Sequence, residues 1–309
     1  MKKAISRLAS IAVMLSLIVS LIACAQDAPV SDVVSQESSG LETSFSDESE
    51  AVSEQAAASG APDDVVIEGK YASVSMAEWD KLDLTYCRFK TPEAFIAEAD
   101  GYFDDIGAYI YGDDWAEKGR DIKVDIQFDS SISRILSKSL INIQIDWFQR
   151  GLEPMAHEVT YSILFNTGIY INKFNLSLSE GFANYCQNMV SDVENMFGYD
   201  TDIHACAKIY LDSDLSPAFD QVGVAGSDLA SQFDSVYRRF HYNYSQSFVA
   251  YLIETYGKDK FMKLISFVTM DVQYREIYGK GLKELKEDWV AFLRAYETDL
   301  DAEKLVAQM

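Results

Sequence analysis

Three side chains in "HEVTY", residues 157–161, have the chemistry of a metal or acid–base site. His157 offers an imidazole nitrogen, Glu158 a carboxylate, and Tyr161 a phenol one helical turn after His157. Residues four apart lie on one face of an α-helix, so two imidazoles at this spacing can share a metal ion. Here the second position carries a tyrosine, which reaches farther than histidine and binds a metal only as phenolate. The segment therefore predicts a helix with an incomplete metal site.

A second acidic segment follows at a defined distance. Eighteen residues separate Tyr161 from Glu180, which lies in "LSEGFANY". We expect one helix from Glu153 to about Phe165 and another that is capped near Ser177 or Ser179. With "HEVTY" on one helix and "SEG" on the next, the chain resembles the gluzincin metallopeptidases, in particular the aminopeptidase N-like and peptidase-MA-like branch. The pattern of that branch is H-E-x-x-H, eighteen residues, then E-G.

The resemblance covers most of residues 90–296. "YSQSFVAYLIETYG" is similar to the family helix whose leading tyrosine assists the transition state, and "GKGLKELKEDWVAFL" is similar to the closing helix of such domains. The resemblance implies that His157 and Glu180 are zinc ligands. It also implies that Glu158 is the general base acting on zinc-bound water, and that Tyr244 hydrogen-bonds to the oxyanion.

Tyr161 stands where the family has its second histidine ligand. Catalytic zinc usually has three protein ligands and an open position for water. With only His157 and Glu180 as ordinary ligands, we expect zinc binding to be weak or absent. In the metal-free alternative, the Tyr161 hydroxyl hydrogen-bonds to Glu180 or His157 in a collapsed pocket. Completion of the site by His204 or His241 is a further alternative.

The surrounding elements predict an α+β domain. "TPEAFIAEADGYFDDIGAYIYG" begins with Thr91 as N-cap and Pro92 at the first helical position, followed by apolar residues at helical spacing. "DIKVDIQFD" and "LINIQIDWF" alternate apolar and polar residues, as half-buried strands do. Helical periodicity recurs over residues 203–211, 243–256, 258–269 and 282–296. We expect a zincin-like domain in which a small sheet packs on the helix of His157, followed by a mainly helical C-terminal half.

The N-terminal residues have the pattern of an export signal. A short basic region precedes an apolar run, Leu8 to Ala23, which is short for a membrane-spanning helix. The run leads into "LIAC", which resembles the lipobox of bacterial lipoproteins and implies cleavage before Cys24 and lipidation of its sulfur. An uncleaved anchor is the alternative. We expect residues 1–23 to be the signal peptide, and the protein to be lipid-anchored outside the cytoplasmic membrane.

Charge and composition divide the rest of the chain. Residues 24–65 carry ten acidic residues and no Lys or Arg, which predicts a disordered acidic tether. Residues 66–309, the predicted peptidase-like domain, carry −16 of the formal −23. Such a charge excludes binding to nucleic acid or anionic lipid through a basic surface. The three cysteines after Cys24 form no disulfide framework, although one pair is compatible with an extracytoplasmic location.

Three classes of function remain. In the first, a surface lipoprotein with a degenerate, non-catalytic site binds peptide or cell-wall material in the family's cleft. In the second, the protein is an active zinc-dependent peptidase with a non-standard His157, Tyr161 and Glu180 site. In the third, it is an assembly lipoprotein whose pocket takes no ligand. Metal content separates the second class from the others, and a ligand in the cleft separates the first from the third.

Overall fold

The computed structural model describes residues 65–152, 154–171, 175–191, 202–212, 219–224, 235–267 and 271–301, and the side chains of residues 235–239 are not described. The chain divides into two units, Met1–Ala58 and Ser59–Met309, and every described residue belongs to the second. The predicted signal peptide, Cys24 and the tether up to residue 64 therefore lie outside the described residues. Within the part that is described, no helix is long and apolar enough to cross a bilayer.

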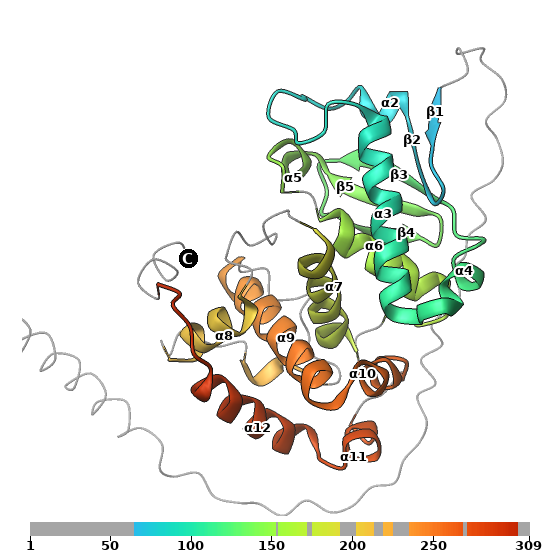
Figure 1. Ribbon diagram of the computed structural model, residues 1–309. Coiled ribbons are helices and arrows are strands. Elements are labelled where there is room, and N and C mark those ends of the chain that lie inside the picture. Colours follow the sequence, from blue (N-terminus) through green and yellow to red (C-terminus); the bar gives the residue numbers. More distant parts are fainter. Residues whose placement is uncertain are drawn as a thin grey trace, which may run out of the picture. The chain divides into compact units, whose positions relative to one another are not determined.

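A five-stranded mixed sheet forms the first half of the domain (Figure 1). Its order is β1 (Val66–Glu68), β2 (Ala72–Ser75), β3 (Val124–Asp129), β5 (Leu140–Gln144) and β4 (Arg134–Ser137). The inner pairs β2–β3 and β3–β5 are parallel, whereas β1 and β4 are antiparallel strands at the two edges. The register places Ile126 opposite Ile141 and Phe128 opposite Ile143. Because alternate residues of a strand share a face, these four buried side chains form one apolar surface.

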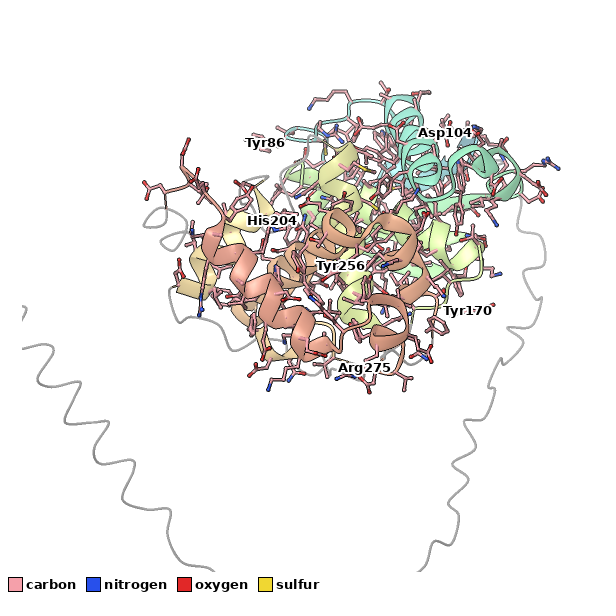
Figure 2. All side chains as sticks on the ribbon, turned by 60° about the horizontal axis from the view of Figure 1, so that its bottom comes forward. Tyr86, Asp104, Tyr170, His204, Tyr256 and Arg275 are labelled. Carbon is pink, nitrogen blue, oxygen red and sulfur yellow. The ribbon has the colours of Figure 1, made fainter. Side chains whose placement is uncertain are left out.

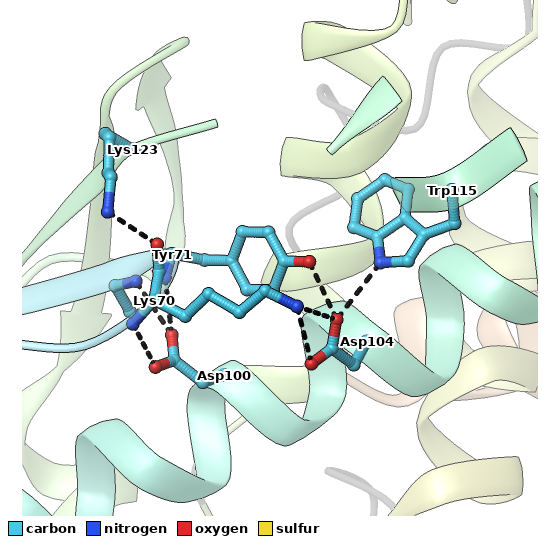
Figure 3. Close-up of polar contacts among 7 residues, drawn as sticks. Lys70, Tyr71, Asp100, Asp104, Trp115 and Lys123 are labelled. Atoms are coloured by element: carbon cyan, nitrogen blue, oxygen red, sulfur yellow. Dashed lines mark hydrogen bonds and ion pairs between the residues drawn. The ribbon is translucent and has the colours of Figure 1, made fainter. Parts of the chain in front are cut away.

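Helix α3 (Pro92–Tyr111) lies across this sheet and is joined to β2 by two aspartates (Figures 1 and 3). The Asp100 carboxylate accepts the backbone N–H groups of residues 70–72, the last two at 2.8 and 3.0 Å. Asp104 accepts hydrogen bonds from the indole of Trp115 at 3.3 Å and from the side chains of Lys70 and Tyr71. Buried backbone donors need partners, so Asp100, which accepts the N–H groups of Tyr71 and Ala72, fixes where β2 begins.

The start of α3 is as predicted from the sequence. Thr91 is the N-cap, and its hydroxyl accepts the N–H of Ala94 at 3.3 Å. Pro92 occupies the first helical position. Short elements complete this half: α2 (Met76–Trp79), η2 (Gly112–Asp114) and α4 (Trp115–Lys118). Tyr86, in the connection before α3, is 83% exposed and stands at the outer surface in Figure 2.

Two consecutive helices carry most of the candidate site residues. The segment "LINIQIDWF" is a strand only to Gln144, because α5 (Ile145–Gln149) begins at Ile145. Ile145 therefore begins a helix, whereas the alternation in this segment predicted a strand throughout. Next come α6 (Met155–Asn166) and α7 (Leu176–Val190). Helix α6 packs against α3, α7 and the strands β4 and β5.

The N-terminus of α7 also differs from the prediction. Asn175 precedes the first helical residue, Leu176, so neither Ser177 nor Ser179 is the N-cap. Both serines lie inside the first turn, fully buried. Their hydroxyls find other partners: Ser179 donates to the Asn175 carbonyl at 2.9 Å, and Ser177 accepts the N–H of Gly223 at 3.0 Å. Ser177 is thus occupied by a contact with the helical half, and Ser179 by a bond within its own helix, so neither serine caps α7.

The C-terminal half is helical, as expected. It contains α8 (Ile203–Asp212), η3 (Phe219–Gln221), α9 (Ser235–Tyr256), α10 (Lys258–Ile265), α11 (Gln273–Tyr278) and α12 (Leu282–Ala295). Helix α9 contacts α7, α8, α10 and α12. The sheet followed by these helices confirms the α+β class.

Candidate functional site

Helix α6 places His157, Glu158 and Tyr161 in the interior. All are buried, with exposed fractions of 4%, 3% and 8% respectively. Every residue of the helix from Met155 to Leu164 is buried, because the sheet, α3 and α7 surround it. A helix buried all round is normally apolar. Because the polar residues of α6 do not face solvent, their presence needs another explanation, such as a role in a binding or catalytic site.

Helix α7 brings Glu180 against His157. The His157 Nε2 and Glu180 Oε2 atoms are 3.3 Å apart. On the other side of the same ring, His157 Nδ1 lies 2.8 Å from Asn184 Oδ1, one turn after Glu180. The two segments, which are eighteen residues apart in the chain, therefore lie side by side in the fold. Asn184 was not singled out by sequence analysis, although its position four residues after Glu180 places it on the same helical face.

Tyr161 lies beside this pair without joining it. Its ring is edge-on to the His157 ring, with centroids 5.0 Å apart. Among the described residues, its hydroxyl has no hydrogen-bond partner. Glu180 is nevertheless close enough to act on this hydroxyl, so the metal-free arrangement expected from the sequence, in which Tyr161 pairs with Glu180, is approached without an aligned hydrogen bond. Burial raises the pKa of this phenol well above its usual value, and the negative charge of Glu180 raises it further.

Glu158 is an unusually placed carboxyl group. Its Oε2 atom is buried and has no hydrogen-bond partner in the described part of the chain. Burial raises the pKa of Glu158 to about 7, against the lowering effect of His157. A carboxyl group that titrates near neutrality suits proton transfer, and such groups cluster at functional sites.

A cavity of about 500 Å³ is lined by His157, Glu158, Tyr161 and Glu180. One wall is the edge strand β4 with the residues before it, 132–137. The rest is mainly apolar, from Trp147 of α5, Phe165 of α6, Leu176 of α7 and Tyr242 of α9. Cavities of this size accept small organic ligands or a few residues of a peptide. The β4 wall escaped sequence analysis, because "SRILS" has no motif that marks an edge strand.

Tyr244 is not part of this cavity. Its side chain is fully buried on α9, where it packs against Phe219 and edge-on against Trp289, with ring centroids 5.7 and 6.1 Å away. The α9 residue that reaches the cavity is Tyr242, whose ring lies 6.5 Å from that of His157. Residues two apart on a helix point in different directions. The structure thus does not bring Tyr244 to the other predicted site residues.

The remaining histidines lie outside the cavity. His204 is held among the C-terminal helices (Figure 2), where its Nδ1 is 2.9 Å from the Ser247 hydroxyl and its Nε2 is 3.3 Å from Glu254. His241 is buried on α9, 3.4 Å from the Ser245 hydroxyl, and burial lowers its pKa to about 4. Neither residue lines the cavity.

The donor set can be compared with the zinc ion that the resemblance implies. Two ligands about 2.0–2.2 Å from a tetrahedral zinc lie about 3.3–3.6 Å apart, so His157 and Glu180 have suitable spacing. A third ligand is missing: the described residues contain no group of three His, Cys, Asp or Glu side chains that could hold a metal. Tyr161 is at the right position in the chain, but its raised pKa opposes the phenolate form. These donors therefore do not fit a catalytic zinc site.

Comparison with known proteins identifies no family: no family model, curated protein or solved structure matches the chain.

The three cysteines after Cys24, namely Cys87, Cys186 and Cys206, are buried thiols.

Proposed function

We propose that this protein is a lipid-anchored, extracytoplasmic lipoprotein whose peptidase-like cleft binds peptide or cell-wall material without hydrolysing it. The observation that carries the proposal is the cavity of about 500 Å³, in which Glu158 and Tyr161 present polar atoms that no described residue satisfies. Buried polar atoms without partners are costly. A binding site explains why such atoms are kept beside a preformed cavity.

The β4 edge supports an extended peptide as the ligand. β4 is the last strand of the described sheet on this side, and residues 132–137 line the cavity. An edge strand offers unpaired backbone groups to a peptide that adds to the sheet, and neighbouring pockets then select its side chains. Exposed Ile132 and Leu136 supply apolar contacts along this wall.

Peptide binding in the presence of a chelator tests the proposal. The full-length lipoprotein in detergent is titrated with short apolar peptides and with cell-wall stem peptides, with EDTA throughout. We expect saturable binding of at least one class, and no cleavage when the peptides are recovered by mass spectrometry. Leu136→Asp should abolish binding by placing a charge on the apolar wall, whereas Val272→Asp, at another exposed position, should not. Absence of binding by every peptide would favour an assembly role.

An active zinc peptidase is the second candidate function. It is favoured by the 3.3 Å spacing of His157 Nε2 and Glu180 Oε2 and by the pKa of Glu158, about 7, which suits a general base. Cleavage that requires zinc and is lost in Glu158→Gln would establish this function in place of the first.

A further inference from the structure

The acidic end of the cavity contains hydrogen-bond acceptors without donors. Glu158 Oε2 has no hydrogen-bond partner among the described residues, and Glu180 Oε2 and the Tyr161 hydroxyl make no aligned hydrogen bond, although Tyr161 lies close to Glu180. Glu180 Oε2 is within ion-pair distance of His157 Nε2, but the two groups are not aligned as a hydrogen bond. Glu158 is 97% buried, so solvent at the surface does not satisfy it. Two carboxylates and a phenol thus converge on one space.

The rest of the lining differs sharply from this end. Ile135, Trp147, Phe165 and Leu176 make it apolar. Two basic side chains belong to the lining: Arg134 is exposed on β4 and its charge acts on Asp129, and His157 lies 3.3 Å from Glu180 but leaves Glu158 Oε2 without a partner. A ligand that satisfies both ends therefore has a cationic donor group joined directly to an apolar body.

Several donor groups can be compared on these grounds. A metal ion lacks its third ligand here, as the donor set shows. An anion is repelled by the two carboxylates, and a neutral hydroxyl has one hydrogen to share between them. A primary ammonium group has three N–H donors and a compact charge, and charge-assisted hydrogen bonds are about twice as strong as neutral ones. It also supplies the counter-charge that buried carboxylates need.

We propose that the cavity binds a primary ammonium group carried on an apolar chain, with the ammonium held by Glu158, Glu180 and Tyr161 in place of a metal ion. This inference rests on the proposed binding function and names the chemistry of its ligand. The apolar part lies against Ile135, Trp147 and Phe165. A free peptide N-terminus and a lysine-type side chain both supply the group.

Binding of a minimal probe tests the inference. The full-length lipoprotein in detergent with EDTA is titrated calorimetrically with n-butylammonium chloride and, separately, with butan-1-ol. We expect the ammonium to bind at least tenfold more tightly than the alcohol. Leucinamide and Nα-acetyl-lysine amide then distinguish an α-amino group from a side-chain amine, and N-acetyl-leucinamide is the uncharged control. Equal binding of n-butylammonium and butan-1-ol would overturn the inference.

Variants locate the charge that is recognised. Glu158→Gln and Glu180→Gln keep the size of each side chain and should each weaken n-butylammonium binding at least tenfold, while Tyr161→Phe should weaken it less. Glu276→Gln, at an exposed glutamate of α11, removes the same net charge and should change affinity less than twofold. Circular dichroism checks that each variant is folded. If one glutamine variant does not fold, the other glutamine variant and Tyr161→Phe are enough to test the inference. Unchanged binding in both folded glutamine variants would contradict the inference.

The outcomes separate this inference from the proposed function. If acetylated apolar peptides bind while every free amine fails, the cleft is a peptide site and the ammonium inference is wrong. If neither peptides nor amines bind, both proposals are wrong. If n-butylammonium binds and the two glutamine variants abolish its binding, the inference holds.

Discussion

At the scale of single residues, the site is defined by polar groups held where they weaken the fold. Glu158 has an unpartnered oxygen inside a helix that is otherwise buried and largely apolar. Natural proteins keep such costs mainly where function requires them. His157 differs, because Asn184 and Glu180 flank its two ring nitrogens. Two adjacent residues thus differ: the His157 ring has a polar neighbour at each nitrogen, whereas the Glu158 carboxylate has an oxygen without a hydrogen-bond partner.

The cost of Glu158 should appear in the pH dependence of stability. Its pKa is raised to about 7 in the folded state from 4.5, so its protonated form favours the fold below pH 4.5. That contribution is lost as pH rises to about 7 and beyond, and a shift of this size corresponds to about 3 kcal/mol. Glu158→Gln removes the effect. We expect it to raise the free energy of unfolding, relative to wild type, by about 1–3 kcal/mol more at pH 8 than at pH 5.

Urea denaturation at both pH values measures this difference. Glu276→Gln is the matched control, because its side chain is exposed and the substitution should change stability equally at the two pH values. An equal effect of Glu158→Gln at pH 5 and pH 8 would show that Glu158 is not a strained carboxyl group.

At the scale of elements, the site depends on how closely α7 approaches α9. A Cβ atom added at Gly181 would lie 2.4 Å from the Ser245 carbonyl oxygen, far inside contact distance. The glycine after Glu180 thus has a steric role: it lets α9 pack against the helix that carries Glu180. Ser177 and Ser245, whose hydroxyls are 3.0 Å apart, continue the same contact.

Gly181→Ala tests this contact. The added methyl group meets backbone rather than a movable side chain, so the two helices must separate. Overpacking of this kind typically costs about 1–3 kcal/mol. We expect thermal unfolding to detect a loss of that size. Gly101→Ala on α3, where an added Cβ meets nothing within 4 Å, should instead gain up to about 1 kcal/mol because alanine favours a helix more than glycine does. Equal stability of Gly181→Ala and wild type would refute the close approach.

The same elements show how far the sequence leads. Thr91 and Pro92 predicted the start of α3 because capping is a local property. The convergence of His157 with Glu180 followed from two short motifs, "HEVTY" and "SEG", at a defined spacing in the chain. The predicted N-cap of α7 was wrong: Ser177 accepts a tertiary hydrogen bond from Gly223, and Ser179 bonds inside the helix to the Asn175 carbonyl. Tyr244 was misplaced for a similar reason: its rotation about the α9 axis depends on packing with Trp289, which no local pattern encodes.

At the scale of the whole molecule, the proposal combines a cleft with an anchor. The domain carries most of a strongly negative charge, so attachment to an anionic membrane requires a lipid rather than a basic surface. Changing Cys24 to Ala should abolish metabolic labelling with a fatty-acid analogue and release the protein from the lipoprotein fraction. Cys87→Ala retains Cys24 and should label normally. Unchanged labelling of Cys24→Ala would exclude the lipobox.

The central claim is that the site at His157 and Glu180 is one zinc ligand short because Tyr161 stands where a second histidine would complete it. Calorimetric titration with zinc of the full-length lipoprotein and its Tyr161→His variant, both stripped with chelator and dialysed, tests it directly. Histidine restores an imidazole one turn after His157, facing Glu180. Loss of a mere supporting group typically costs 10–100-fold in metal affinity, so the variant should bind zinc at least about 100-fold more tightly than the natural protein. Equally tight binding by both proteins would contradict the account, because Tyr161 or another residue would then already complete the site.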